Sequence, residues 1–345
     1  MRCDNGRSTM NRQKLKVISN LLLLLTALIW GIAFVAQSVG MDHVGPWTFV
    51  FFRNIISAVV LMPVVVFVQK HKAGPDYAAG VNPGSAGSAA FTASDGTRVS
   101  SDRPAAPSWK QLLRAHLPGG ILCGVFLAGA SIAQQVGIQY TTAGKAGFIT
   151  AMYVVLVPLI SIFLGKRPGK QIWFSVLLGI VGLYLISVKE GFQIGTGDIL
   201  VMLCALLFSG QILCIDHYSP KVENVVLLSD IQFFTTAVIT FAGMMIFERP
   251  SMENVLAVAM PILYAGLLSG AAGYTLQMIA QKHTDPTVAS LLMSLESVFS
   301  ALAGWAILGE ILTLKELSGC ALVLAAVILA QIPLGRRKNS EKVNK

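Results

Sequence analysis

Long runs of apolar residues recur along the chain, each bounded by charged residues, proline or glycine. A helix needs about 20 apolar residues to cross a hydrocarbon core about 30 Å thick, so these runs predict membrane-spanning helices. They are continuous and do not alternate with polar residues, which disfavours a membrane β-barrel. The ten expected spans are 18–38, 47–69, 117–138, 144–165, 172–188, 198–216, 225–246, 259–280, 286–308 and 316–334.

Composition supports a fold embedded in lipid. Of the 345 residues 54% are hydrophobic and only 12% are charged, and the mean hydropathy is +0.67. Soluble domains carry about 25% charged residues, so this chain cannot cover a water-facing surface. We therefore predict an all-α integral membrane protein without a large extramembrane catalytic domain.

The basic residues predict the orientation. The apolar stretch that starts at Val17 is longer than the 7–15 residues, roughly, of a signal peptide, so it is expected to remain as the first span. If the N-terminus is cytoplasmic, 21 of the 26 Lys and Arg residues lie inside and four outside, with Arg53 within a span. The positive-inside rule thus predicts a multi-pass protein with both termini cytoplasmic. The net charge of +9 flanks the spans, so no nucleic acid is expected as a partner.

The chain divides into two five-helix halves, 17–188 and 198–334, between a basic N-terminus (1–16) and a basic tail (335–345). Residues 73–108 are rich in Ala, Gly, Ser and Pro, which predicts a disordered cytoplasmic insertion in the first half. The halves align at an offset of 144, with a GxxxG pair in corresponding spans: Gly120 and Gly124, Gly266 and Gly270. Since five is odd, the second half enters the membrane inverted, and inverted repeats are typical of secondary transporters.

Glu296 is the main candidate for chemistry. It lies about ten residues into the ninth expected span, about 15 Å deep and close to the bilayer centre. A charged carboxylate there costs about 2.5–3.5 kcal/mol, so it must face a cavity, find a partner or hold a proton. The alternative is a structural hydrogen bond to a neighbouring helix.

Arg53, in the second span, has three open uses: an ion pair with Glu296, binding of an anionic substrate group, or snorkelling to the outer headgroups. Further polar or aromatic residues recur within the spans, and glutamines there either line a polar path or hold helices together. The other candidate transport residues are Trp30, Gln135, Gln139, Tyr153 and Gln277. Pro158 is expected to kink the fourth span.

Several motifs are absent from the sequence. There is no phosphate-binding loop, no HExxH and no GxSxG, and the five cysteines show no zinc-type spacing. We therefore expect no ATP hydrolysis by that route, no enzyme activity, no cofactor and no metal. An intramembrane enzyme acting on lipid-like substrates would need clustered Asp, His or Glu, whereas the histidines are scattered.

The sequence resembles the drug/metabolite transporter superfamily in its EamA-type branch, over nearly the whole chain apart from the termini and 73–108. The matching segments are Trp30-Gly31-x-x-Phe34, Phe52-Arg53, Gln139 to Gly147, Gly273 to Gln277, and Leu308-Gly309-Glu310. The resemblance implies a ten-helix permease of the cell (inner) membrane, built from two inverted halves, that moves small organic solutes by alternating access, commonly as an exporter.

The predicted function is secondary active transport, with export expected, of small organic metabolites or drugs, and protons are a candidate coupling ion. The expected partners are the small-molecule substrate and the lipid bilayer. A facilitative permease of the same fold without ion coupling stays open as the alternative.

Overall fold

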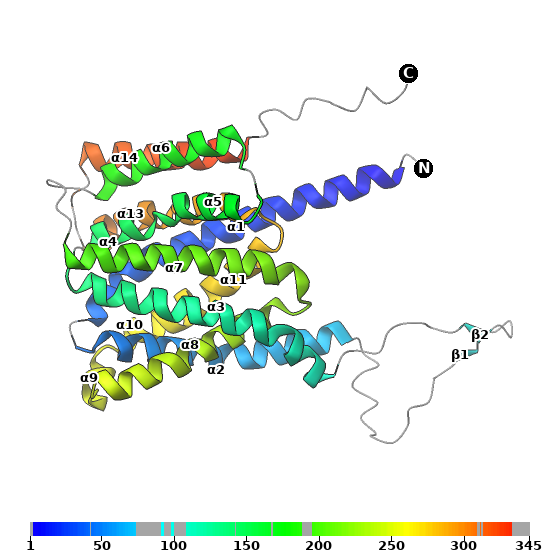
Figure 1. Cartoon of the computed structure of the whole chain (residues 1–345), viewed down its shortest axis with the longest axis horizontal. Helices are drawn as coiled ribbons and strands as arrows, with labels where there is room; N and C mark the ends of the chain where they lie inside the picture. The colour runs from blue at the N-terminus through cyan, green and yellow to red at the C-terminus, as the bar shows by residue number, and fades with distance from the viewer. Residues whose placement is uncertain are drawn as a thin grey trace.

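The computed structural model describes residues 3–41, 43–73, 91–92, 98–99, 108–141, 143–166, 168–187, 195–308, 311 and 313–332. Nearly all of them are helical (Figure 1). The first half contains α1 (Cys3–Gly40), α2 (Pro46–Ala73), α3 (Trp109–Ile138), α4 (Ala143–Thr150), α5 (Tyr153–Phe163) and α6 (Lys170–Ser187). The second half contains α7 (Thr196–Tyr218), η2 (Ser219–Lys221), α8 (Val225–Phe247), α9 (Met252–Ala257), α10 (Ala259–Leu263), η3 (Tyr264–Tyr274), α11 (Thr275–Gln281), α12 (Pro286–Met293), α13 (Glu296–Leu308) and α14 (Leu314–Gln331).

The predicted all-helical membrane fold is confirmed, but the count of ten spans is not. In the described part of the chain nine helices are long and apolar enough to cross a membrane. The expected span 172–188 corresponds to α6, whose apolar part, Lys170–Ile186, is shorter than the others.

The helices that begin and end the described chain share one end of the bundle. α1 begins and α14 ends there, and α2 ends and α3 begins at the same end (Figure 1). Two short antiparallel strands, β1 (Phe91–Thr92) and β2 (Arg98–Val99), lie within the predicted insertion and pair Phe91 with Val99. The rest of 74–107 lies outside the described residues, so the expected disorder of this loop stays a prediction.

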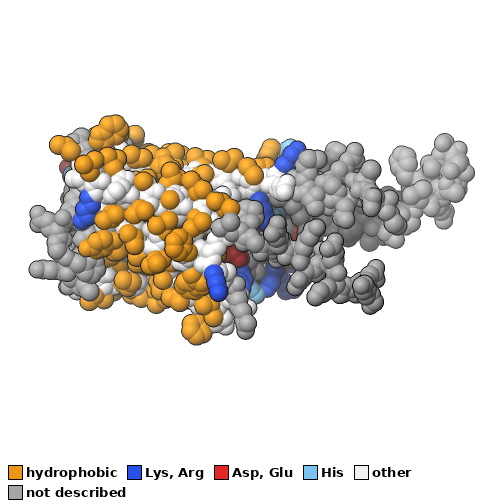
Figure 2. Space-filling model, turned by 90° about the horizontal axis from the view of Figure 1, so that it is seen from above, with side chains coloured by type: hydrophobic (Ala, Val, Ile, Leu, Met, Phe, Trp, Pro, Cys, Tyr) orange, Lys and Arg blue, Asp and Glu red, His pale blue; other side chains and the backbone are white. Residues whose placement is uncertain are grey.

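The outer surface of the bundle is apolar. Figure 2 shows hydrophobic side chains over the middle of the visible face and charged side chains toward its ends. Phe163 is 90% exposed, Ile246 73% and Phe247 69%. So much exposed apolar area would be unstable in water, and it is the surface that lipid tails cover.

Small residues let the helices approach closely, as the GxxxG pairs predict. A Cβ atom at Gly120 would lie 2.5 Å from the Ile231 side chain, and one at Gly124 would lie 2.7 Å from the Gln232 carbonyl oxygen, so α3 rests directly on α8. At one edge of the bundle α6 and α14 pack together in the same way (Figure 1). There Gly182 faces Gly319.

Two of the long helices are interrupted at matching places. The fourth expected span breaks at Ala151–Met152 and the ninth at 294–295, and at each break one backbone N–H, that of Met152 or Leu295, bonds to the carbonyl three residues earlier. The expected kink at Pro158 is not where the helix breaks, since α5 continues through it. The second segments begin at Tyr153 and Glu296, which are 143 residues apart.

The interrupted helices run in opposite directions. α4 packs against α13, and α5 packs against α12. This antiparallel arrangement is the one that an inverted repeat requires, and it brings the two breaks together in the centre of the bundle.

The eighth expected span widens in its middle. Between α10 and α11, the eleven residues of η3 form a π-helix. This conformation is rare in proteins overall, and where it occurs it is often at a functional site. Its carbonyl oxygens accept side-chain hydrogen bonds from α1 and α2: Ser57 to Gly266 at 2.8 Å and Trp30 to Ser269 at 3.0 Å. These bonds fix η3 against both helices beside the two breaks.

Candidate functional site: a central cavity

A cavity lies at the two breaks. It contains about 460 Å³ of space between its walls, including the open side. The side chains that line it come from α1, α2, α3, α4, α5, α7, η3, α11, α12 and α13, and hence from both halves. The lining residues are Trp30, Ala33, Phe34, Gln37, Arg53, Gln134, Thr150, Tyr153, Phe208, Gln211, Ile212, Ser269, Tyr274, Gln277, Met293 and Glu296.

The cavity extends from the middle of the bundle toward the end opposite the start of α1. Gln37 lies three residues before the end of α1, Arg53 lies seven residues after the start of α2, and Gln134 lies four residues before the end of α3. At 1.5 Å per residue these positions are about 5 to 10 Å from that end of the bundle. Glu296 is deeper, at the break in the ninth expected span.

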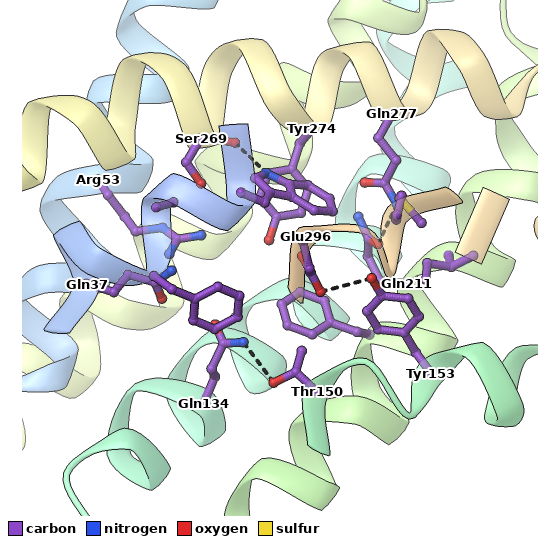
Figure 3. Close-up of a pocket in the computed structure, with 16 residues that line it drawn as sticks. Gln37, Arg53, Gln134, Thr150, Tyr153, Gln211, Ser269, Tyr274, Gln277 and Glu296 are labelled. Atoms are coloured by element: carbon purple, nitrogen blue, oxygen red, sulfur yellow. Dashed lines mark hydrogen bonds between the residues drawn. The ribbon is translucent and has the colours of Figure 1, made fainter. Parts of the chain in front are cut away.

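Glu296 lies at the centre of this arrangement (Figure 3). The side chain is 4% exposed, and its Oε1 atom accepts a hydrogen bond of 2.9 Å from the Tyr153 hydroxyl. Two serines upstream, Ser290 and Ser294, bond to backbone carbonyls three residues earlier, which competes with the helical ladder just before Glu296. The local sequence thus ends one helical segment and starts the next at the acidic residue.

Amide side chains continue the polar lining on both sides of Glu296. Gln134 donates to the Thr150 hydroxyl at 3.1 Å. Gln277 donates to Gln211 at 3.4 Å, and Gln211 in turn donates to Gln232 at 3.1 Å. The first bond joins α3 to α4 within the first half, and the other two join α11, α7 and α8 within the second half.

The lining repeats with the same spacing as the breaks. Three pairs of lining residues are separated by 143 positions: Gln134 and Gln277, Thr150 and Met293, Tyr153 and Glu296. The two halves therefore contribute equivalent positions to one site. A glutamine is kept in the first pair, whereas the other two pairs differ in chemistry.

Aromatic rings form one wall. The Trp30 and Tyr274 ring centroids are 4.6 Å apart, and Phe233 packs against Tyr274 at 5.8 Å. Trp30 cannot turn freely, because its indole N–H is bonded to Ser269 and Gly273 lies directly behind that nitrogen. This wall is rigid and apolar, and it suits the flat side of a small organic molecule.

Arg53 lies near the end of the cavity that is closest to the start of α2. Only 4% of the side chain is exposed, and its Nε atom has no hydrogen-bond partner. Both Arg53 and Glu296 are described, and they form no ion pair with each other. The guanidinium and the Tyr274 hydroxyl are close enough to interact electrostatically.

Five of the seven candidate residues from the sequence line the cavity: Trp30, Arg53, Tyr153, Gln277 and Glu296. Gln135 and Gln139 do not. Gln135 is buried and donates to the Gln37 backbone at 3.3 Å, so it joins α3 to α1, and Gln139 is exposed at the end of α3. Gln134, one position earlier on the helix, faces the cavity in their place.

Several residues that line the cavity were not singled out from the sequence. Gln37 and Ser269 gave no signal beyond being polar residues within spans, and Tyr274 lies in the segment Gly273 to Gln277 that carries the family resemblance but was not chosen as a candidate. Gln134 and Gln211 were visible as glutamines in apolar surroundings, and the spacing of 143 from Gln134 to Gln277 was the signal that could have selected the right one. Asp230, a second carboxylate within an expected span, was also missed. It is half-buried on α8 and does not line the cavity.

The fold and the site define a class of protein. An apolar multi-span bundle encloses a polar cavity built from equivalent positions of two halves, as in membrane transporters. The EamA-like transporter family matches residues 17–94, 103–188 and 195–331. The chain belongs to the EamA-like transporter family.

Known relatives agree with this assignment. An uncharacterized transporter of Archaeoglobus fulgidus is 31% identical over 318 residues, covering 92% of this chain and 87% of that protein. The uncharacterized transporter YoaV of Bacillus subtilis is 22% identical, covering 92% and 97%. A solved crystal structure superposes with a TM-score of 0.65 at 16% identity, over 94% of this chain and 98% of that chain, which shows a common fold.

Among the described residues no group of three or more His, Cys, Asp or Glu side chains could hold a metal ion. The chemistry that the described cavity offers is therefore that of one carboxyl group, one guanidinium, several amides and hydroxyls, and an aromatic wall.

Proposed function

We propose that this protein is a secondary active transporter that exports small organic solutes by alternating access, and that Glu296 holds the coupling proton. One observation carries the proposal: a carboxyl group lies at the break of a membrane helix, inside a cavity lined by both halves. A buried carboxyl group that forms no ion pair with a described basic residue is most stable with a proton bound, and it can release that proton when water enters the cavity.

Alternating access is supported by the shape of the cavity and by the breaks. The cavity extends toward one end of the bundle, while at the other end the Lys166 ammonium of the first half forms an ion pair with the Asp216 carboxylate of the second. Each broken helix offers a hinge beside the site, at Ala151–Met152 and at 294–295. Rotation about these hinges would close the open end and separate Lys166 from Asp216.

The orientation in the membrane comes from the basic residues. The positive-inside rule places the end with the start of α1 and the end of α14 in the cytoplasm. In this orientation the cavity extends toward the outer face of the membrane.

Substitution of Glu296 by Gln tests the proposal. Metabolites retained by cells with and without the protein are first compared, and the solute that the protein depletes is then loaded into proteoliposomes. With wild type, flux should follow an imposed pH gradient, whereas Glu296→Gln should remove this dependence because the amide cannot release a proton. Glu253→Gln, an exposed change in α9, is the matched control and should behave as wild type.

Two results separate the alternatives. Flux that is equal with and without a pH gradient in wild type would identify a facilitative permease of the same fold. Gradient-driven flux that survives Glu296→Gln unchanged would remove Glu296 as the coupling group.

A further inference from the structure

Arg53 is a buried cation that forms no ion pair with a carboxylate in the described part of the chain. It remains charged in any surroundings, and a charged side chain buried within a membrane helix is costly unless a partner or water compensates it. The side chain is 4% exposed, which leaves no room for snorkelling to the headgroups. Ionised groups that are buried in this way are paired or bind a ligand.

Figure 3 shows the guanidinium directed into the cavity beside Gln37, across from Tyr153. Within the described lining Arg53 is the one basic side chain and Glu296 the one acidic side chain. The Arg53 Nε donor and the Gln37 Oε1 acceptor are both buried without a hydrogen-bond partner. An unused donor of a buried guanidinium that is aimed into an open cavity is what an anion-binding site requires.

We propose that Arg53 binds the carboxylate of the transported solute, and that the solute is a small organic monocarboxylate with a flat apolar body. A carboxylate matches the fork of the guanidinium with two parallel hydrogen bonds. A phosphate group carries more charge at neutral pH and would call for a second cation, which the described lining does not supply. The aromatic wall of Trp30, Phe34 and Tyr274 then contacts the apolar body of the solute.

The charges of the cavity also connect the anion to the proton. When Glu296 holds a proton, the described lining carries one positive charge, which a monocarboxylate neutralises. When Glu296 is ionised, its charge opposes that of Arg53, and an incoming anion is bound less strongly. The solute and the proton therefore bind together, and by linkage each raises the affinity for the other. This inference rests on the proposed transport function.

The test uses the purified full-length protein and probes that differ in one group. Benzoate and 3-phenylpropionate are compared with their neutral amides and with phenyl phosphate, by titration calorimetry and by thermal stabilisation. At least one carboxylate should bind about 10- to 100-fold more tightly than its amide, the range expected for charge-assisted hydrogen bonds. Because this comparison is made in wild type, it does not depend on how well a variant folds.

Substitutions then assign the effect to Arg53. Arg53→Gln should remove the preference for carboxylate over amide, and Arg53→Lys should keep part of it through the remaining charge. Arg249→Gln, which removes an exposed arginine after α8, is the matched control and should keep the full preference.

Three results would overturn the inference: carboxylates that bind no better than amides, phenyl phosphate that binds better than every carboxylate, or a preference that persists in a folded Arg53→Gln protein. None of these results would contradict the transport proposal, which is tested by flux under a pH gradient and by Glu296→Gln. Conversely, wild-type flux that does not depend on the pH gradient, together with a preference for carboxylate over amide, would refute proton coupling and would still support the binding site at Arg53.

Discussion

The hydrogen bond between Tyr153 and Glu296 provides a direct test of the protonation state of the carboxyl group. Tyr153→Phe removes only the hydroxyl that donates to Glu296 Oε1 at 2.9 Å, and the ring keeps its packing. Both side chains are almost fully buried, at 3% and 4% exposed, so water does not replace the lost donor freely.

The size of the effect depends on the charge of Glu296. A hydrogen bond to a neutral acceptor contributes about 0.5–1.5 kcal/mol to stability, and one to a charged acceptor about 1.5–3 kcal/mol. The cost of Tyr153→Phe should therefore lie in the lower range at acidic pH, where Glu296 holds its proton. It should rise by about 1 kcal/mol or more as pH increases and the carboxyl ionises.

Tyr264→Phe is the matched control. The Tyr264 hydroxyl donates to the Ile29 backbone carbonyl at 3.0 Å, a neutral acceptor, so its removal should cost the same at every pH. Both variants are measured against wild type by equilibrium unfolding in mixed SDS and mild-detergent micelles across a pH series. In a Glu296→Gln background the cost of Tyr153→Phe should become independent of pH.

The reasoning would be refuted by a cost of Tyr153→Phe that shows no pH dependence beyond that of Tyr264→Phe. A cost that falls as pH rises would be equally contrary, because an ionised acceptor must bind the hydroxyl more strongly than a protonated one.

The remaining predictions concern the packing of two glycines and the ion pair between Lys166 and Asp216. In Gly273→Ala the new methyl would lie 2.6 Å from the Trp30 indole nitrogen, so the variant should lose about 1–3 kcal/mol of stability in thermal unfolding and shift the tryptophan fluorescence. Gly147→Ala, where no neighbour lies within 4 Å of the new methyl, should be neutral or stabilising, and equal behaviour of the two variants would contradict this account. Asp216→Lys should cost no more than about 1 kcal/mol, because the ion pair with Lys166 is partly exposed, and the exchange of both charges should restore the wild-type unfolding temperature.

Much of the fold follows from residue order alone. Each long apolar run became a helix, because lipid leaves the backbone no other way to satisfy its hydrogen bonds within one segment. The GxxxG pairs predicted close helix contacts, and Gly120 and Gly124 indeed rest against α8. The depth of Glu296 could be counted from the start of its span, and this placed it near the centre of the bundle.

The sequence was less informative about which side of a helix faces the cavity. Gln134 and Gln135 are neighbours in the chain but point about 100° apart on the helix, and an apolar span with little amphipathic pattern does not reveal its buried side. The structure places Gln134 in the cavity and Gln135 against α1. The break in the fourth expected span was not anticipated either. Pro158 predicts a local kink, whereas the break that precedes α5 falls at Ala151–Met152.

The amino-acid order by itself determined that this protein lies in a membrane, where its helices run, and that it carries an acidic group at a depth where lipid does not tolerate one, because these properties depend on length, hydropathy and counting. Only the tertiary structure decided that Tyr153 meets Glu296, that Arg53 pairs with no described carboxylate, and that the two breaks enclose one cavity. Those facts depend on the rotation and crossing of helices far apart in the chain, which the pattern of residues along one helix does not specify.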